Sequence, residues 1–459
     1  MPIDPRSALG GFAARPFDRR SVLKLGAVLG GTAMLAACSG PSVGGDTAAT
    51  AAPDTDWDGI QPATDITWWT THPGQTSDLE AQFAADFLAK TGITVNVVTG
   101  GASYDEIAQK LQAAAGTDSM PDMVNASDTW WFRYMVNKQS IAMDGLMSHL
   151  GFEVDDFNKV FLDDYLYNGA RYAVPYARST PIFYYDKSIW QKAGLPDRAP
   201  DTWAELEEWA PAIMKVTGGN PAVRLPQGSI GTWAMSNVLW GRGGQYSDGW
   251  DLKLDQPETL EAAGYARGLV FDSKIANVAA ASGDTAVDFA GGLAPCTIAS
   301  AGAVGIVTAS AKFPIGTGVL PGGPQGQFVP TGGTGLAVIG SKTKEQQLAA
   351  AMFIKHLTEV DQQVALAKKT GYAPSRTSAG ESTDLTGFWA SNLAFRTVYD
   401  SLEHVRSQDW ARTLIPNGDT YLQQPWSQIL TQDADPAAVF PAAATQLTSA
   451  YTENVQPYL

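Results

Sequence analysis

Apolar and polar positions at the start of the folded part alternate in two periods, one of two residues and one of about 3.6. Residues 65–69 and 93–98 have the alternation and composition of strands. A capping box at Ser103–Glu106 predicts a helix start, and residues 121–127 read as a third strand. The first helix is indicated by apolar residues at helical spacing: Leu79, Phe83, Phe87 and Leu88. Strands and helices in this order predict a parallel α/β sheet.

A second α/β block follows residue 178 with different segment lengths. Thr202–Glu205 is another capping box, residues 259–271 have helical periodicity, and 295–300 read as a buried strand. Residues 314–340 predict two strands around a Gly/Pro-rich loop. Helices are expected to dominate the C-terminal third, at 343–357, 360–369, 384–400, 420–431 and 437–452. The chain therefore predicts two α/β lobes with a mainly helical end.

The segment RSTPIFYYDKSIWQKAGLP, residues 178–196, combines a strand with a short helix. Pro181 keeps the preceding residue extended, which suits a strand that crosses from one lobe to the other. Asp186 is expected to cap a helix that ends at Gly194. Tyr184 and Tyr185 are therefore expected to belong to the scaffold of the second lobe.

The N-terminus has the pattern of a bacterial export signal. Two arginines, Arg19 and Arg20, precede an apolar run over 25–37 that is too short to span a bilayer. The arginine pair resembles a twin-arginine signal, and the run ends Leu-Ala-Ala-Cys, which resembles a lipobox. We predict that 1–37 is a lipoprotein signal peptide and that Cys38 is lipidated; a chance cysteine is the alternative.

The predicted location is extracytoplasmic, on the outer face of the cell membrane and anchored through the lipid on Cys38. Residues 38–63 are rich in Gly, Ala, Thr and Pro without periodicity, and we expect a flexible tether there. Cys296 is the one other cysteine, so no internal disulfide is expected once Cys38 is lipidated.

Charge and motifs exclude several classes of function. The net charge of −16, with no basic stripe, argues against nucleic acid as a partner. The four histidines have no metal-ligand spacing, no phosphate-binding GxxxxGK[ST] loop occurs, and Cys296 reads as an inert core thiol. We expect no metal, no cofactor and a binding protein in place of an enzyme. An exported hydrolase with two carboxylates remains a distant alternative, since acidic residues are plentiful.

Four segments, at 180–210, 297–307, 330–339 and 368–376, together resemble one known family. They resemble extracellular solute-binding proteins of ABC importers, and within these the branch that binds glycerol 3-phosphate and glycerophosphodiesters. The resemblance covers about residues 64–455. It implies a periplasmic-binding-protein-like α/β fold, two lobes joined by a hinge with the ligand cleft between them. Lobe one is expected at 64–175 plus 303–357, and lobe two at 176–302 plus 358–459.

The resemblance also implies the ligand site, residue by residue. Tyr104 is expected to close over a glycerol backbone, Asp128 to accept hydrogen bonds from hydroxyls, and Arg412 to bind phosphate. Gly332 and Gly333 would let backbone N–H groups approach an oxygen. The full expected set is Tyr104, Asp128, Ser179, Trp233, Trp240, Ser300, Gly332, Gly333, Tyr372 and Arg412.

Several of these residues also have plain structural interpretations. Asp128 is a candidate N-cap, Arg412 a candidate surface salt bridge, and Tyr104 a half-exposed first residue of a helix. Arg178 and Arg376 are alternative cations for the phosphate. Gly302 stands where the family often has a serine, and the Trp-containing loop 228–241 has no unambiguous register, with Trp233 and Trp240 as stacking candidates.

The sequence therefore predicts a monomeric, membrane-tethered receptor for a small polar solute. It would capture glycerol 3-phosphate or a glycerophosphodiester by closure of two lobes and deliver it to the membrane subunits of an importer. A receptor for a mono- or oligosaccharide is the alternative within the same class.

Overall fold

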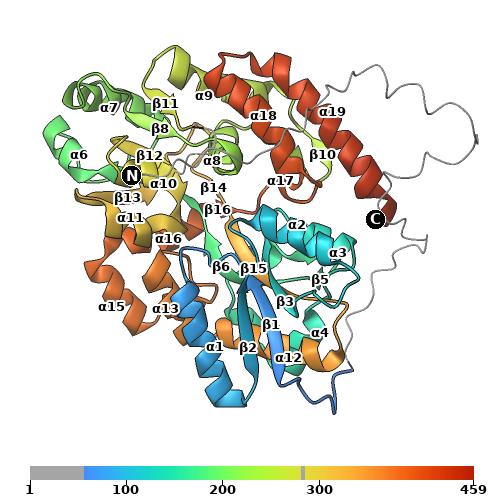
Figure 1. The fold of residues 1–459 in the computed structure, drawn as a ribbon. Helices are drawn as coiled ribbons and strands as arrows, with labels where there is room; N and C mark the ends of the chain where they lie inside the picture. Colours follow the sequence, from blue (N-terminus) through green and yellow to red (C-terminus); the bar gives the residue numbers. More distant parts are fainter. Residues whose placement is uncertain (1–55, 281–284) are drawn as a thin grey trace, which may run out of the picture. The chain divides into compact units, whose positions relative to one another are not determined.

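The computed structural model describes residues 56–280 and 285–459, which form two five-stranded mixed sheets (Figure 1). In the first sheet, three parallel strands are continued by two strands in antiparallel pairing. Its strand order is β2 (Thr94–Thr99), β1 (Asp65–Thr70), β3 (Met123–Ser127), β15 (Gly332–Val338) and β6 (Val174–Ser179). β15, drawn in orange in Figure 1, thus lies between β3 and β6, which precede it by more than 150 residues.

Helices cover both faces of the first sheet, and the alternating side chains of β1 pack against them on the two sides. Trp68 packs in one core with α1 (Ser77–Thr91) and α12 (Lys344–Leu357). Trp69, the next residue, packs in another core with α2 (Tyr104–Ala114) and α3 (Trp131–Val136). Successive residues of a strand point to opposite faces, so the pair of indoles holds helices on both sides of the sheet.

The second sheet repeats this arrangement. Its order is β11 (Ala276–Val278), β8 (Val223–Leu225), β12 (Cys296–Ser300), β7 (Pro181–Asp186) and β13 (Ile315–Val319). Along β7, Tyr184 packs on one face and Tyr185 on the other, both almost fully buried. The expectation that these tyrosines are scaffold is confirmed. Asp186 accepts hydrogen bonds from Ser188 N and Ile189 N, and Gly194 ends α6 (Lys187–Ala193) with a positive φ, both as expected.

The second sheet is covered by helices from three stretches of the chain. Those packed in its larger core are α6, α7 (Trp203–Val216), α8 (Gly228–Gly241), α9 (Pro257–Phe271), α17 (Trp410–Thr413), α18 (Gly418–Thr431) and α19 (Pro436–Asn454). Those packed in its smaller core are α10 (Thr285–Ala290), α11 (Val304–Ser310), α13 (Val360–Thr370), α14 (Thr377–Gly380), α15 (Thr383–Ser391) and α16 (Thr397–Asp400). The remaining short elements are α4 (Asp144–His149), α5 (Lys159–Asp163), β4 (Leu166–Tyr167), β5 (Ala170–Arg171), β9 (Ser247–Asp248), β10 (Asp251–Leu252), β14 (Val329–Pro330) and β16 (Val405–Arg406).

The chain crosses between the sheets at Thr180, where β6 of the first sheet runs directly into β7 of the second. It returns over residues 320–331, between β13 and β15. The pairing of the strands differs from the expected division into lobes in two places. β6 stays in the first sheet up to Ser179, and β13 belongs to the second sheet. The lobe boundaries themselves remain a prediction.

Two expectations about local structure are wrong. The expected helix 384–400 is broken at Asn392, whose φ of −136° and ψ of 62° are not helical, so α15 and α16 are separate. The expected tether 38–63 does not extend to residue 63, because Trp57 is buried in the first core. The signal peptide, Cys38 and tether residues up to 55 lie outside the described residues.

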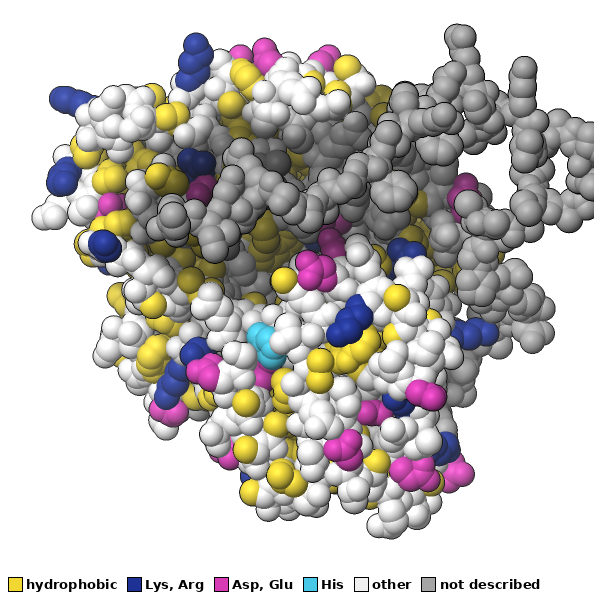
Figure 2. All heavy atoms as spheres, in the orientation of Figure 1, with side chains coloured by type: hydrophobic (Ala, Val, Ile, Leu, Met, Phe, Trp, Pro, Cys, Tyr) yellow, Lys and Arg dark blue, Asp and Glu magenta, His cyan; other side chains and the backbone are white. Residues whose placement is uncertain are grey.

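Charged side chains of both signs lie interspersed over the described part of the face in Figure 2. No single-sign basic patch is visible on that part of the face.

Candidate functional site

A cavity of about 250 Å³ lies where strand ends of the two sheets meet. The first sheet contributes the ends of β3 and β6 and the start of β15, and the second contributes the end of β12 and the first turns of α8. Ligands of open α/β sheets bind outside the carboxyl ends of strands, and this cavity has that position. Its lining residues are Tyr104, Ser127, Asp128, Thr129, Ser179, Ser229, Ile230, Trp233, Ser300, Gly332, Gly333, Tyr372, Gln408 and Arg412.

The structure brings together every expected ligand residue except Trp240. The side chain of Trp240 is buried elsewhere. Its Nε1 lies within 3.3 Å of both carboxylate oxygens of Asp409, and the guanidinium of Arg406 lies over its ring. Trp233 and Trp240 are two turns apart on α8, about 10 Å along its axis, and the cavity meets only the first turns. Of the two stacking candidates, Trp233 is therefore the one that lines the cavity.

Asp128 is part of a buried charge cluster, and its interpretation as an N-cap is wrong. Arg178, fully buried, donates to Asp128 Oδ1 at 2.6 Å and to Asp164 Oδ2 at 2.5 Å. The N-cap of α3 is Trp130, without a side-chain cap. Burial raises the pKa of Asp164 to about 6, although Arg178 lowers it. Arg178 is thus an internal counterion of Asp128, and it is not among the lining residues.

Arg412 is buried, so a surface salt bridge does not describe it. Its side chain is 5% exposed and its Nε lies 2.9 Å from Asp419 Oδ1. Its Nη2 donates to the backbone oxygen and the hydroxyl of Ser229, at 3.0 and 3.2 Å. These contacts hold the guanidinium plane against the cavity. One N–H group of Nη1 donates to Gln408, and the other can be presented to an anion.

Arg376, the other alternative cation, lies away from the cavity. It forms an ion pair with Asp156 at 3.1 Å and donates through Nε to the backbone oxygen of Thr358. Phe157 lies 4.5 Å from its guanidinium. Its role is to join the segment after α13 to the first lobe.

The glycines of the site are required by the close packing of their neighbours, and the expected approach of backbone N–H groups to a ligand stays a prediction. A Cβ on Gly332 would lie 2.1 Å from the ring of Trp233, so this position must be glycine for the indole to pack there. Gly333 has φ +102°, and its Cβ would lie 2.1 Å from Ala177 O. A Cβ on Gly302 would meet the ring of Tyr372 at 2.3 Å, which explains why no serine stands there.

Hydroxyl groups complete the lining of the cavity. Tyr104 and Tyr372 share a side-chain hydrogen bond, and burial raises the pKa of both phenols, so they stay neutral. The Ser300 hydroxyl accepts from Gly302 N at 3.2 Å, and Tyr184 donates to Ser300 O at 2.7 Å. The sequence interpretation missed five lining residues: Ser127, Thr129, Ser229, Ile230 and Gln408. Ser127 and Thr129 flank Asp128 at a strand end, a signal that was available; the other three follow no recognisable pattern.

A buried carboxyl behind the cavity predicts a specific pH dependence of stability. Burial raises the pKa of Asp409 to about 6, from 3.8, against hydrogen bonds from Tyr246 N and Trp240. Between pH 4 and 6 the unfolded chain loses this proton first, so the free energy of unfolding falls as pH rises through that window, by about 2–3 kcal/mol in total. Asp409→Asn should remove this contribution in chemical denaturation across pH 4–7. Parallel curves for wild type and variant would contradict the assignment; exposed Asp248→Asn is the control.

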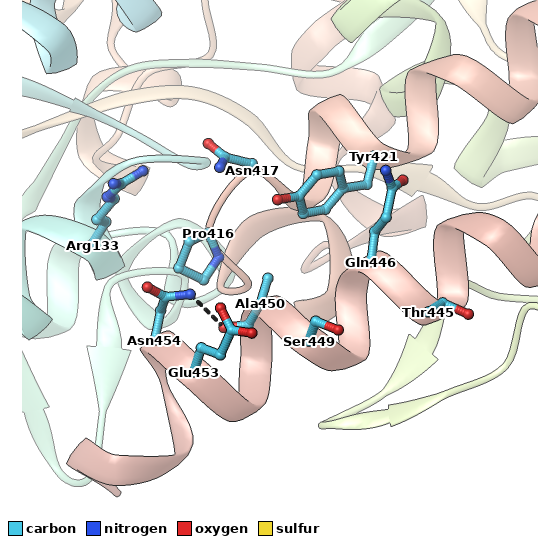
Figure 3. Close-up of a pocket in the computed structure, with 10 residues that line it drawn as sticks. All are labelled: Arg133, Pro416, Asn417, Tyr421, Thr445, Gln446, Ser449, Ala450, Glu453 and Asn454. Carbon is cyan, nitrogen blue, oxygen red and sulfur yellow. Dashed lines mark hydrogen bonds between the residues drawn. The ribbon is translucent and has the colours of Figure 1, made fainter. Parts of the chain in front are cut away.

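A second hollow, of about 260 Å³, lies between α3 and α19 (Figure 3). Its single arginine, Arg133, packs over Trp130, and burial lowers the pKa of Arg133. The other lining residues are Pro416, Asn417, Tyr421, Thr445, Gln446, Ser449, Ala450, Glu453 and Asn454, and those from α19 are mostly exposed. Size does not distinguish the two hollows, but buried ion pairs, Arg178 with Asp128 and Arg412 with Asp419, lie at the cavity that Asp128 lines.

The family model for bacterial extracellular solute-binding proteins matches residues 82–397, and the chain belongs to this family. Among solved structures, UgpB from Mycobacterium tuberculosis in complex with glycerophosphocholine superposes with a TM-score of 0.81 at 36% identity, covering 86% of this chain and 100% of that one.

Two further comparisons agree. The sn-glycerol-3-phosphate-binding periplasmic protein UgpB of Rhizobium meliloti (strain 1021) is 27% identical over 353 residues, which cover 72% of this chain and 80% of the relative. The maltose-bound MalE3 of T. maritima, at 22% identity, has a TM-score of 0.72 and covers 84% of this chain and 100% of its own, which supports the fold alone. The expected fold class, two α/β lobes of the solute-binding type, is confirmed.

Two further observations concern the described residues, 56–280 and 285–459. None of their helices combines the length and apolar character needed to cross a bilayer. Nowhere among them do three or more His, Cys, Asp or Glu residues gather in a geometry that could hold a metal ion.

Proposed function

We propose that this protein is the substrate-binding lipoprotein of an ABC importer that captures glycerol 3-phosphate or a glycerophosphodiester. One observation carries this proposal: a single cavity holds a carboxylate, Asp128, and a guanidinium, Arg412, contributed by the two lobes. The carboxylate suits the hydroxyls of a glycerol unit, and the guanidinium suits a phosphate. The UgpB structure with glycerophosphocholine supports the same class of ligand.

Charge around the cavity favours the diester over glycerol 3-phosphate. Arg178 is already shared by Asp128 and Asp164, and Arg412 is paired with Asp419. Two guanidinium groups therefore face three carboxyls, so a singly charged phosphodiester adds less repulsion than a doubly charged monoester. The rings of Trp233, Tyr104 and Tyr372 offer aromatic surface to a quaternary ammonium head such as choline.

We also propose that the protein binds its ligand without turnover, which the same lining supports. Hydrolysis by two carboxylates needs both within reach of one bond, and Asp128 is the one acidic residue that lines the cavity in the described part of the chain. The hydroxyl of Ser179, 2% exposed, also lines it and is available to a ligand oxygen. Closure of the lobes would complete these contacts and present the solute to the importer's membrane subunits.

Lipidation of Cys38 would keep the receptor at the outer face of the membrane. Mass spectrometry of the protein purified from membranes tests this part, with Cys38→Ser as control. Loss of the acyl mass and release from the membrane in the variant are expected; an unmodified Cys38 in the wild type would refute it.

Calorimetric titration of the full-length chain tests the ligand class. We expect stoichiometric binding of glycerophosphocholine, weaker binding of glycerol 3-phosphate, and no heat from maltose or glucose. Binding of sugars alone would refute the phosphate assignment in favour of a sugar receptor. Product formed in the cell would refute the receptor assignment altogether.

A further inference from the structure

We propose that Gln408, to which no role has been assigned, is a specificity-determining positioning residue that couples Asp128 to Arg412. This inference rests on the proposed function, because it concerns how one ligand is held at both ends. Gln408 lies between β16 and α17, lines the cavity and is 6% exposed.

Both N–H groups and the oxygen of the Gln408 amide form hydrogen bonds. Its Nε2 donates to Asp128 Oδ2 at 2.9 Å and to Thr331 O at 2.7 Å. Its Oε1 accepts from Arg412 Nη1. An amide turned the other way would place its oxygen against a carboxylate and a carbonyl, so the surroundings permit one orientation only.

Gln408 also joins the two lobes. Asp128 follows β3 of the first sheet. Arg412 belongs to α17, and the residue before it, Ala411, is buried in the core of the second sheet. The bond to Asp128 therefore forms when the lobes are closed, and the bond to Arg412 fixes the guanidinium relative to that carboxylate. The distance between the hydroxyl-binding and phosphate-binding groups then depends on one side chain.

A neutral amide is the group that this place requires. A glutamate at 408 would set a carboxylate beside Asp128 Oδ2 and Thr331 O, replacing a donor by a repelling oxygen. A protonated glutamate would recover one donor toward Asp128 while its carbonyl still accepts from Arg412. Affinity of Gln408→Glu should therefore recover as the pH falls, which a purely structural role would not produce.

Other charged and ionisable groups near this amide are present in both proteins. These are Asp128, Asp164, Arg178, Tyr165, Arg406, Asp409, Arg412 and Asp419. Because wild type and variant share them, the ratio of their dissociation constants at each pH isolates residue 408.

The experiment is calorimetric titration of full-length wild type, Gln408→Glu and Gln408→Met with glycerophosphocholine from pH 5 to 8. We expect about a 10- to 100-fold loss for Gln408→Met at every pH, since a buried acceptor and donor lose their partner. Gln408→Glu should lose at least as much at pH 7.5, and its ratio to wild type should shrink by about tenfold toward pH 5. Gln347, a buried glutamine that donates to Ile339 O and Gly340 O away from the cavity, is the matched control as Gln347→Glu and Gln347→Met.

Three outcomes overturn the inference. If both Gln408 variants bind within twofold of wild type, Gln408 does not position the ligand groups, while the proposed function stands. If Gln408→Glu is weakened by a factor that does not change with pH, its role is only structural. If the wild type binds no phosphorus-containing ligand, the proposed function fails and this inference fails with it. Thermal unfolding of each variant identifies loss of fold. If one of the two variants, Gln408→Glu or Gln408→Met, does not fold, the other still tests the role of Gln408.

Discussion

Replacing Asp128 with asparagine is expected to weaken binding of glycerophosphocholine by about 10- to 100-fold with little loss of fold. A hydrogen bond from a ligand hydroxyl to a charged acceptor contributes about 1.5–3 kcal/mol, which corresponds to that factor. Asparagine keeps the shape but offers one acceptor oxygen, and its NH₂ group would oppose the amide of Gln408 or the guanidinium of Arg178.

The fold should survive because the charge cluster has a second acid. Removal of a sole partner from a buried ion pair costs about 3–5 kcal/mol, but here Asp164 still lies 2.5 Å from Arg178. Removing the Asp128 charge also removes one of the influences that raise the pKa of Asp164, so Asp164 becomes a better counterion. Calorimetry measures the affinity and chemical denaturation measures the stability of the same preparation.

Asp144→Asn is the matched control for this substitution. Asp144 also pairs with an arginine of the first lobe, Arg171 at 2.8 Å, but it lies away from the cavity. We expect this variant to lose some stability and no affinity. Equal affinity of wild type and Asp128→Asn for glycerophosphocholine would remove Asp128 from the site.

The sequence predicts the elements of the two sheets well because their signals are local. The alternation at Trp68 and Trp69, the cap at Asp186 and the glycine at 194 act over a few residues, and each forms as expected. The two failures have different causes. Asn392 interrupts a helix whose apolar spacing continues past it, and Trp57 is held by a core that the sequence before residue 64 does not reveal.

The candidate site is harder to predict because its lining comes from many segments far apart along the chain. Asp128 and Gln408 are 280 residues apart, yet they share a hydrogen bond. The resemblance to a family led to the positions of nine lining residues, and it could not separate Trp233 from Trp240, which lie on the same helix. Gln408 stands in an irregular stretch, and only its three contacts in the folded chain give it a role.

Replacing Arg412 with lysine is expected to lower the affinity for glycerophosphocholine by about 100-fold or more. Truncating one partner of a buried, hydrogen-bonded charge pair costs about 2–5 kcal/mol, mostly in the dissociation rate. Lysine keeps the charge for Asp419, but its single ammonium cannot also contact Ser229, Gln408 and a phosphate in one plane. The retained charge keeps Asp419 paired, so the loss reports on ligand contacts and not on an unpaired carboxylate.

Stopped-flow binding of the full-length chain separates the two rates for this variant. We expect dissociation to accelerate and association to stay within a few-fold of wild type, because the net charge is unchanged. Arg198→Lys is the control, since Arg198 also pairs with a carboxylate, Glu205 at 2.6 Å, outside the cavity and with its side chain 42% exposed. If Arg412→Lys binds the phosphodiester as tightly as wild type, the phosphate is held by other groups, and backbone N–H groups near Gly332 become the next candidates. The variant should lose affinity for glycerophosphocholine and glycerol 3-phosphate, and neutral sugars should give no heat with either protein. This result would show that the guanidinium binds the anion and that the receptor binds phosphate-bearing ligands.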